Sequence, residues 1–317
     1  MALKGDFIGF EFNGIHSSDL GIIRTSDGSR YNENLLPTFQ DQTVQIPGGD
    51  GSYYFGTIYT NRQFSIPIAF DNLSEENFRK LRTVFDGKTM GKLIFDEAPY
   101  KYYMVKPTGT PQLKYICFGR TGEQRVYKGE GTINFVAYYP FAKSVATWLN
   151  TTLQKKENVN EWKVESKLPL AAPMTSTSAA KNTISIYNAG DLPMEWWVYI
   201  KKVGTSVKMG QIKCYTGEFS DTIEIGKIEI TKDIALEEEE TGILIDSRTC
   251  LASGVKELTS SFTSNKYGDI TTTKNLYNQN ISGEFFKIPV LSNNEETVTM
   301  EFTGLICNNL CYEYIYY

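Results

Sequence analysis

The sequence predicts a mostly β protein built from two domains, with one clear helix in the first. Its 317 residues fit two domains with separate cores better than one. The chain contains 20 Tyr, 18 Phe and 26 Gly but only 11 Pro, and Thr, Ile and Val recur throughout, a mixture that suits half-buried strands. Short segments of alternating apolar and polar residues follow one another along most of the chain. One internal boundary between two β-rich domains is therefore expected.

The N-terminal domain is expected to begin with short strands separated by tight turns. Residues 7–12 alternate around aromatic positions and end on Asn13-Gly14, a strong hairpin signal. A second strand is predicted near residues 20–24, and a third, residues 43–46, runs into a glycine-rich loop. Successive glycines permit positive φ angles, so we expect this loop to separate two strands and to protrude. The loop contains Gly48, Gly49, Asp50 and Gly51.

The next strand carries a proline in its middle. Residues 64–70 alternate with period two, but Pro67 has no backbone N–H and cannot donate to a β ladder. The pattern therefore favours an edge or a bulge, and an exposed edge invites a neighbouring subunit. We interpret Pro67 and the loop at residues 48–51 as candidate contacts between subunits.

The most secure helix is predicted over residues 74–85. Its apolar residues share one face of a 3.6-residue period, Ser74 suits the N-cap, and Gly87 can end the helix. Further strands are predicted at residues 92–95, 102–105, 115–118 and 131–137. These elements complete an N-terminal domain of residues 1–145.

Periodicity fades after this domain. We place a linker at residues 146–180, with a short helix around residues 145–154 and a later part rich in Pro, Ala, Ser and Thr. Regularly spaced strands resume in residues 181–317 without a helical period between them. A β-sandwich is therefore predicted for the C-terminal domain.

Composition excludes several classes of function and location. Lys and Arg number 32 against 37 Asp and Glu, a net charge of −5, so specific nucleic-acid binding is not expected. The sequence lacks both a membrane span and the apolar core of a secretory signal, so cytoplasmic synthesis without membrane insertion is expected. The five cysteines are interpreted as reduced, buried apolar fillers: Cys117, Cys214, Cys250, Cys307 and Cys311.

The sequence offers little for catalysis. His16 is its single histidine, and we interpret it as a loop or surface residue and not as a general base. Asp96 and Glu97 are neighbours in a strand, so their carboxylates point to opposite faces and cannot act as a pair. The glycines at 48–51 are not followed by Gly-Lys-Ser/Thr, which excludes an NTPase phosphate loop. We therefore expect neither an enzyme nor a cofactor.

Metal ligands are equally scarce. Cys307 and Cys311 stand four residues apart without Cys or His partners in the surrounding sequence, which argues against zinc. The run Glu237–Glu240 could offer oxygen ligands to Ca²⁺, but it lacks the Asp/Asn-Gly spacing of a dedicated loop. A solvated loop is the favoured interpretation, and no metal site is predicted.

A set of short motifs runs in order through the first 145 residues. They are Phe10–Gly14, Ser18–Ile22, Ile46–Gly51, Asn61-Arg62, Leu73–Glu76, Gly91–Glu97, Gly129–Gly131 and Tyr138–Ala142. Together they resemble the N-terminal domain of the distal tail protein (Dit) family of long-tailed bacteriophages. The later part of the chain resembles this family in its strand-rich type, which in the family is usually a galectin-like β-sandwich.

The resemblance implies a structural protein of the virion. It implies a homohexameric ring at the distal end of the tail, with N-terminal domains around the channel and C-terminal sandwiches outside. Such a ring joins the tail tube protein to the tail-tip protein, and receptor-binding proteins are further candidate partners. Six copies carry a formal charge of six times −5, or −30, which discourages DNA in the channel from sticking.

Two other functions compete with the structural hub. Trp196-Trp197 alternate faces in a strand, so one indole could stack on a sugar while its neighbour enters the core. The alternative function is therefore a carbohydrate-binding module that contributes to host attachment, although two packing tryptophans are the more ordinary interpretation. A tail-associated hydrolase would need a carboxylate pair or a nucleophile with its base, and the sequence offers neither.

Overall fold

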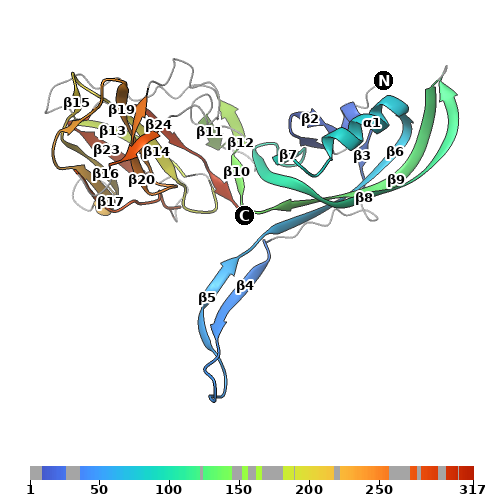
Figure 1. The fold of residues 1–317 in the computed structure, drawn as a ribbon, viewed down its shortest axis with the longest axis horizontal. Coiled ribbons are helices and arrows are strands. Elements are labelled where there is room, and N and C mark those ends of the chain that lie inside the picture. Colours follow the sequence, from blue (N-terminus) through green and yellow to red (C-terminus); the bar gives the residue numbers. More distant parts are fainter. Residues whose placement is uncertain are drawn as a thin grey trace. The chain divides into compact units, whose positions relative to one another are not determined.

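The structure is a computed structural model, and its contacts divide the chain into two compact units. The N-terminal unit consists of residues 1–145 with Tyr316–Tyr317, and the C-terminal unit of residues 146–315. The structure describes residues 9–25, 36–121, 124–144, 152–155, 162–165, 181–188, 190–217, 222–256, 272–276, 280–291, 298–305 and 307–317. Figure 1 shows that both units are built almost entirely of strands, which confirms the predicted mostly β fold.

A single antiparallel sheet forms the body of the N-terminal unit. Its strand order is β2-β1-β7-β8-β9-β6-β3, with β10 and β25 attached beside β8. The strands are β1 Phe10–Phe12, β2 Ile15–His16, β3 Ile23–Arg24, β6 Arg62–Ser74, β7 Gly91–Phe95, β8 Lys101–Thr121, β9 Gln124–Ala137, β10 Ala142–Ser144 and β25 Ile315–Tyr316. The three long strands β8, β9 and β6 run side by side at its centre (Figure 1).

The long strands are held in a close antiparallel ladder. β9 pairs with β6 from Arg62↔Ala137 to Ser74↔Val126 and with β8 on its other side. A side chain at Gly129 would collide with the carbonyl oxygen of Lys114, so β8 and β9 approach more closely than a larger residue allows. This ladder is the scaffold on which the rest of the unit is placed.

Phenylalanines fill the core on one face of the sheet. The ring of Phe135 on β9 is fully buried, and its centroid lies 6.4 Å from Phe10, 5.2 Å from Phe12 and 5.9 Å from Phe85. Such tilted and edge-to-face pairs add to the free energy gained by burying the rings. The cluster joins β1, β9 and the end of the helix.

The single α-helix among the described residues is α1, Glu75–Val84, as predicted. Ser74 is its N-cap and accepts a hydrogen bond from the backbone N–H of Asn77 at 3.2 Å, while two glutamates occupy the first turn. Phe78 and Leu81 are its buried residues. None of the described residues forms a helix with the length and apolar character needed to cross a membrane.

The last residues of the chain return to the N-terminal unit. β25 pairs with β10, and the hydroxyl of Tyr103 donates a hydrogen bond to the carbonyl oxygen of Tyr317 at 3.3 Å. The rings of Tyr100 and Tyr316 pack with centroids 5.6 Å apart. The predicted second domain ran to residue 317, but this packing places Tyr316 and Tyr317 with the first unit.

The predicted linker contains regular structure. β11, Thr152–Lys155, pairs with β12, Trp162–Glu165, in a two-stranded sheet. A short helix around residues 145–154 was the expectation, and it is wrong for residues 152–154, which are extended. Residues 145–151, 156–161 and 166–180 lie outside the described residues.

Two five-stranded antiparallel sheets make up most of the C-terminal unit. Their orders are β13-β23-β16-β17-β22 and β21-β20-β19-β14-β24, and β15 and β18 form a separate pair. The strands are β13 Lys181–Ile186, β14 Trp196–Lys201, β15 Ser206–Val207, β16 Gly210–Thr216, β17 Ile223–Ile230, β18 Ile234–Ala235, β19 Glu240–Asp246, β20 Leu251–Lys256, β21 Thr272–Asn275, β22 Ile281–Gly283, β23 Val298–Thr303 and β24 Cys307–Tyr312. Both sheets contribute fully buried residues, including Met300 on β23 and Trp196 on β14, as a β-sandwich requires.

Phe135→Ala should destabilise the N-terminal unit by about 3–5 kcal/mol, because it removes a ring that three other rings surround. Calorimetric unfolding of the full chain measures the effect. Tyr138→Ala is the matched control, since that aromatic ring is 61% exposed and its loss should change the stability by less than about 0.5 kcal/mol. Equal effects of the two substitutions would contradict this account of the core.

Candidate assembly interface

A two-stranded arm leaves the N-terminal sheet between β3 and β6. It consists of residues 36–59 and contains β4, Phe39–Val44, and β5, Tyr53–Tyr59. Among the described strands these two pair only with each other, in the register Phe39↔Tyr59 to Val44↔Tyr53. Figure 1 shows the hairpin projecting from the sheet. Seven residues of β5 give the arm a length of about 23 Å.

The arm carries an unusual amount of exposed apolar surface. Nine of the nineteen large exposed hydrophobic residues in the described parts of the chain lie within it. The three most exposed of these nine arm residues are adjacent: Tyr53 (63% exposed), Tyr54 (62%) and Phe55 (71%). A two-stranded hairpin is marginally stable alone, and an apolar patch of this kind marks an interaction site. The arm therefore has the character of a segment that another surface covers.

Both faces of the arm carry exposed apolar side chains among polar ones. Phe39 and Tyr59 are cross-strand partners and share one face, whereas Ile58 points to the other. On the first face, the hydroxyl of Thr57 donates to the carboxylate of Asp41 at 2.5 Å and lies 2.6 Å from the hydroxyl of Tyr54. Neither face is wholly polar, so exposed apolar side chains remain on both sides of the arm.

The glycine-rich loop forms the tip of the arm. The backbone N–H of Gly49 donates to the carbonyl of Ile46 at 3.1 Å, and Gly48 and Gly51 have φ values of +83° and +88°. Positive φ at both positions explains the glycines. The structure thus brings the predicted contact residues Gly48, Gly49, Asp50 and Gly51 together at one exposed turn.

An aromatic cluster anchors the base of the arm. The ring of Tyr59 packs against Phe141 at 5.4 Å and against Tyr317 at 6.1 Å, and these last two rings lie 5.9 Å apart. The N–H of Thr60 donates to the carbonyl of Thr38 at 2.7 Å, which closes the hairpin at its base. The terminal residue of the chain therefore helps to orient the arm.

Pro67 lies on the sheet and not on the arm. It pairs with Thr132 of β9, and its carbonyl accepts a hydrogen bond from Thr25 at 2.9 Å. Among the described residues, β3 covers β6 only at Ile68 and Ala69. The backbone nitrogen of Pro67 faces the end of the short strand β3. The hydrogen that this nitrogen lacks is therefore not needed for the ladder between β6 and β9.

The two tryptophans proposed for sugar stacking have different environments. Trp196 is fully buried, its indole N–H donates to the carbonyl of Phe286 at 2.9 Å, and the two rings lie 4.9 Å apart. It is a core residue and cannot stack on a sugar, so its selection as a candidate is wrong. Trp197 is partly buried, and the guanidinium of Arg248 lies 5.9 Å from its ring centre.

The single histidine is part of a structural capping group. Nδ1 of His16 accepts from the backbone N–H of Ser18 at 3.2 Å and lies 2.6 Å from its hydroxyl. Nε2 lies 3.1 Å from the carboxylate of Asp96, which also accepts from the N–H of Gly9 at 2.6 Å. These bonds cap the 3-10 helix at Ser17–Leu20 and tie it to β7. Sequence reasoning missed Asp96 here, because it lies 80 residues from His16.

The acidic run Glu237–Glu240 is more structured than predicted. Glu240 is fully buried, and its carboxylate accepts a hydrogen bond from the backbone N–H of Glu237 at 2.9 Å. The expectation of a wholly solvated loop is wrong at this residue, because the carboxylate closes a tight turn before β19. Among the residues that the structure describes, no group of three or more His, Cys, Asp and Glu side chains could hold a metal ion.

Comparison with known proteins finds a family match within the N-terminal unit. Residues 17–137 match the family described as phage tail protein RIFT-related domain. The fold is similar to the crystal structure of the Dit protein (gp 19.1) of SPP1, described as a paradigm of the hub adsorption apparatus in phages that infect Gram-positive hosts. The identity is 11% and the TM-score 0.52, over 98% of this chain and 100% of the other. No curated protein matches the sequence. The predicted resemblance to distal tail proteins is confirmed.

The cysteines should differ sharply in reactivity. Cys117 and Cys250 are exposed, contrary to the prediction of buried fillers, whereas Cys214 is buried and burial raises its pKa to about 12. Because the thiolate is the reactive form, maleimide at about pH 8 should modify the first two and spare Cys214. Peptide mass spectrometry measures the labelling, and the chain unfolded in guanidinium is the control. Modification of Cys214 as fast as Cys117 in the folded protein would contradict its burial.

Proposed function

We propose that this chain, whose residues 17–137 match the phage tail RIFT-related domain, is the hub at the distal end of a long tail. Six copies close into a ring that joins the tail tube protein to the tail-tip and host-adhesion proteins. DNA passes through the channel of this ring without base-specific recognition. The protein is made in the host cytoplasm and is part of the virion.

The exposed arm is the observation that carries this proposal. A closed ring needs two different surfaces on each protomer, because a head-to-tail contact repeats around the ring. The arm supplies one such surface, since the exposed apolar side chains on both of its faces need cover that the single chain does not give. The tip residues 48–51 and the strand edge near Pro67 are the proposed contacts between subunits.

Removing the arm should abolish the ring. The test replaces residues 40–58 by a short Gly-Ser turn, which keeps Phe39 and Tyr59 at the base. Multi-angle light scattering should give a mass six times that of the chain for the natural protein and a single chain for the variant. The reason is the loss of the apolar surface that drives association.

A matched control removes exposed apolar surface elsewhere. Ile223→Ser changes a residue that is 67% exposed on β17 of the C-terminal unit, and the ring should remain intact. A hexamer that persists without the arm would defeat the proposal that the arm assembles the ring. If the natural protein is a monomer at every concentration, the proposed hub function is excluded.

A carbohydrate-binding module is the second candidate, and one arrangement in the C-terminal unit favours it. Trp197 is only partly buried beside Arg248, whose Nε donates to the buried carboxylate of Asp246 at 3.0 Å. A partly exposed aromatic ring beside a guanidinium that a buried carboxylate holds in place suits the apolar face and hydroxyls of a sugar.

Calorimetric titration of the full chain with host wall polysaccharide tests this candidate. Binding heat that disappears in Trp197→Ala and persists in Ile223→Ser is the expected result, because only the first change removes the ring beside Arg248. Trp196→Phe offers no useful comparison, since that ring is in the core. If no wall polysaccharide gives heat with the natural protein, this second function is excluded.

A further inference from the structure

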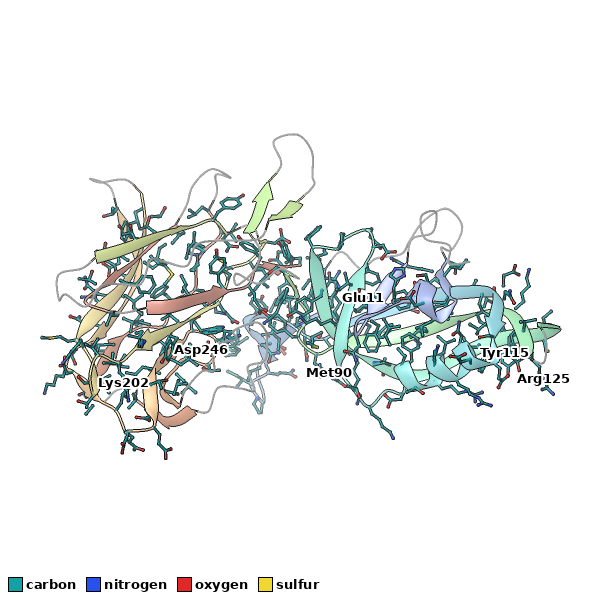
Figure 2. All side chains as sticks on the ribbon, turned by 90° about the horizontal axis from the view of Figure 1, so that it is seen from above. Glu11, Met90, Tyr115, Arg125, Lys202 and Asp246 are labelled. Atoms are coloured by element: carbon teal, nitrogen blue, oxygen red, sulfur yellow. The ribbon has the colours of Figure 1, made fainter. Side chains whose placement is uncertain are left out.

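A second exposed apolar surface lies at the far end of the N-terminal sheet. Tyr115 (48% exposed) and Ile116 (65%) are adjacent on β8, and Cys117 beside them is also exposed. We call these three residues, with Lys114 and Lys128, the β8 patch. Figure 2 shows Tyr115 and Arg125 at the end of the N-terminal unit that is remote from Met90.

The patch surrounds an open strand edge. β7 and β10 cover β8 only from Lys101 to Val105, and from Lys106 to Thr121 the described strands pair with it on the β9 side alone. An unpaired edge presents backbone N–H and C=O groups that another strand can bind. This stretch of β8 is therefore a docking edge as well as an apolar patch.

Apolar side chains cover both sides of that edge. Tyr115 packs on the helix side, where its ring lies 5.1 Å from Phe78 and 5.5 Å from Tyr127. Ile116 points to the opposite face, since neighbouring strand residues alternate. The β8 patch therefore has apolar side chains on both sides of the strand edge. The β4–β5 arm likewise has exposed apolar side chains on both of its faces.

The charges of the arm and of the β8 patch are complementary. Residues 36–59 contain two carboxylates, Asp41 and Asp50, and no Lys or Arg. Residues 106–131 contain five cations against two carboxylates, a net charge of +3 in a protein whose total is −5. The cations are Lys106, Lys114, Arg120, Arg125 and Lys128. Lys128 also pairs with Asp71 at 2.7 Å, where both side chains are exposed.

The two surfaces lie at opposite ends of the same ladder. The arm joins β6 at Arg62, which pairs with Ala137, whereas Ile116 pairs with Lys128 near the other end of β9. Within the chain both surfaces are exposed, so the arm does not cover its own patch. Surfaces at opposite ends of one domain are what a repeating head-to-tail contact uses.

We propose that the β8 patch of one protomer receives the arm of the adjacent protomer. The aromatic residues Tyr53, Tyr54 and Phe55 cover Tyr115 and Ile116, and Asp50 at the tip faces Lys114 and Lys128. The partner is a second copy of this chain. This inference rests on the proposed ring, and it adds the identity of the surface that the arm binds.

The exposed thiol of Cys117 allows a direct test. Ser52→Cys places a second thiol at the tip of the arm, and a short bis-maleimide should then join neighbouring protomers through Cys117. A denaturing gel should show a ladder of two to six linked chains. The matched control adds Cys117→Ser to Ser52→Cys, which should remove the ladder although Cys250 remains exposed.

Charge reversal tests the same contact between the arm and the β8 patch independently. Asp50→Lys alone and Lys114→Asp alone should each weaken assembly about tenfold, since each places like charges together. The combination of both should restore assembly to within about threefold of the natural protein, because it exchanges the two charges across the contact. Light scattering over a dilution series measures each variant.

The outcomes separate this inference from the proposed ring. A ladder that depends on Cys117, together with rescue by the double charge exchange, establishes the patch as the receiving surface. A stable hexamer in which Cys117→Ser leaves the ladder unchanged, or in which the double exchange is as weak as the single ones, overturns the patch and leaves the ring standing. A natural protein that never exceeds a single chain overturns both.

Discussion

The close ladder of β8, β9 and β6 is the constraint on which the N-terminal unit depends. β9 is paired on both sides, and Gly129 leaves no room for a side chain between it and β8. One face of this ladder holds the phenylalanines around Phe135. Because three long strands are fixed in one register, the two ends of the ladder are fixed as well. The arm leaves from one end and the β8 patch lies at the other.

The arm exposes apolar side chains that folding of the single chain does not bury, and the proposed assembly covers them. Beyond the base at Tyr59, the apolar side chains on both faces of the arm remain exposed in the single chain, because no other described strand pairs with the arm. Covering them on a neighbour removes that surface from water and supplies free energy for association. The same logic explains the acidic tip, since Asp50 is exposed on the arm of a single chain and the opposite end of the ladder is basic. In the proposed ring, complementary charge selects the register in which the arm docks.

Sequence reasoning succeeded where the signal was local and failed where the structure joined distant segments. The helix after Ser74 was predictable from a cap and a 3.6-residue period. β8 was expected as two strands, at residues 102–105 and 115–118. In the structure Pro107 pairs with Phe135, and Gly109 and Pro111 lie in an irregularity between Thr108 and Gln112 of one continuous strand. The exposure of Phe55 and its neighbours was also missed. A run of aromatic residues without an alternating polar face was its one sequence signal.

By itself, the sequence determined the mostly β class, the helix after Ser74, the glycine-rich loop at residues 48–51 and the scarcity of catalytic groups, since each follows from local patterns or from composition. Only the tertiary structure decided which tryptophan is buried, that Asp96 meets His16 across 80 residues, and that Tyr317 packs at the base of the arm. Strand alternation predicts that neighbours point to opposite faces, but it does not say which face is covered. Covering depends on strand register and on partners far away in the chain, and these are properties of the folded protein alone.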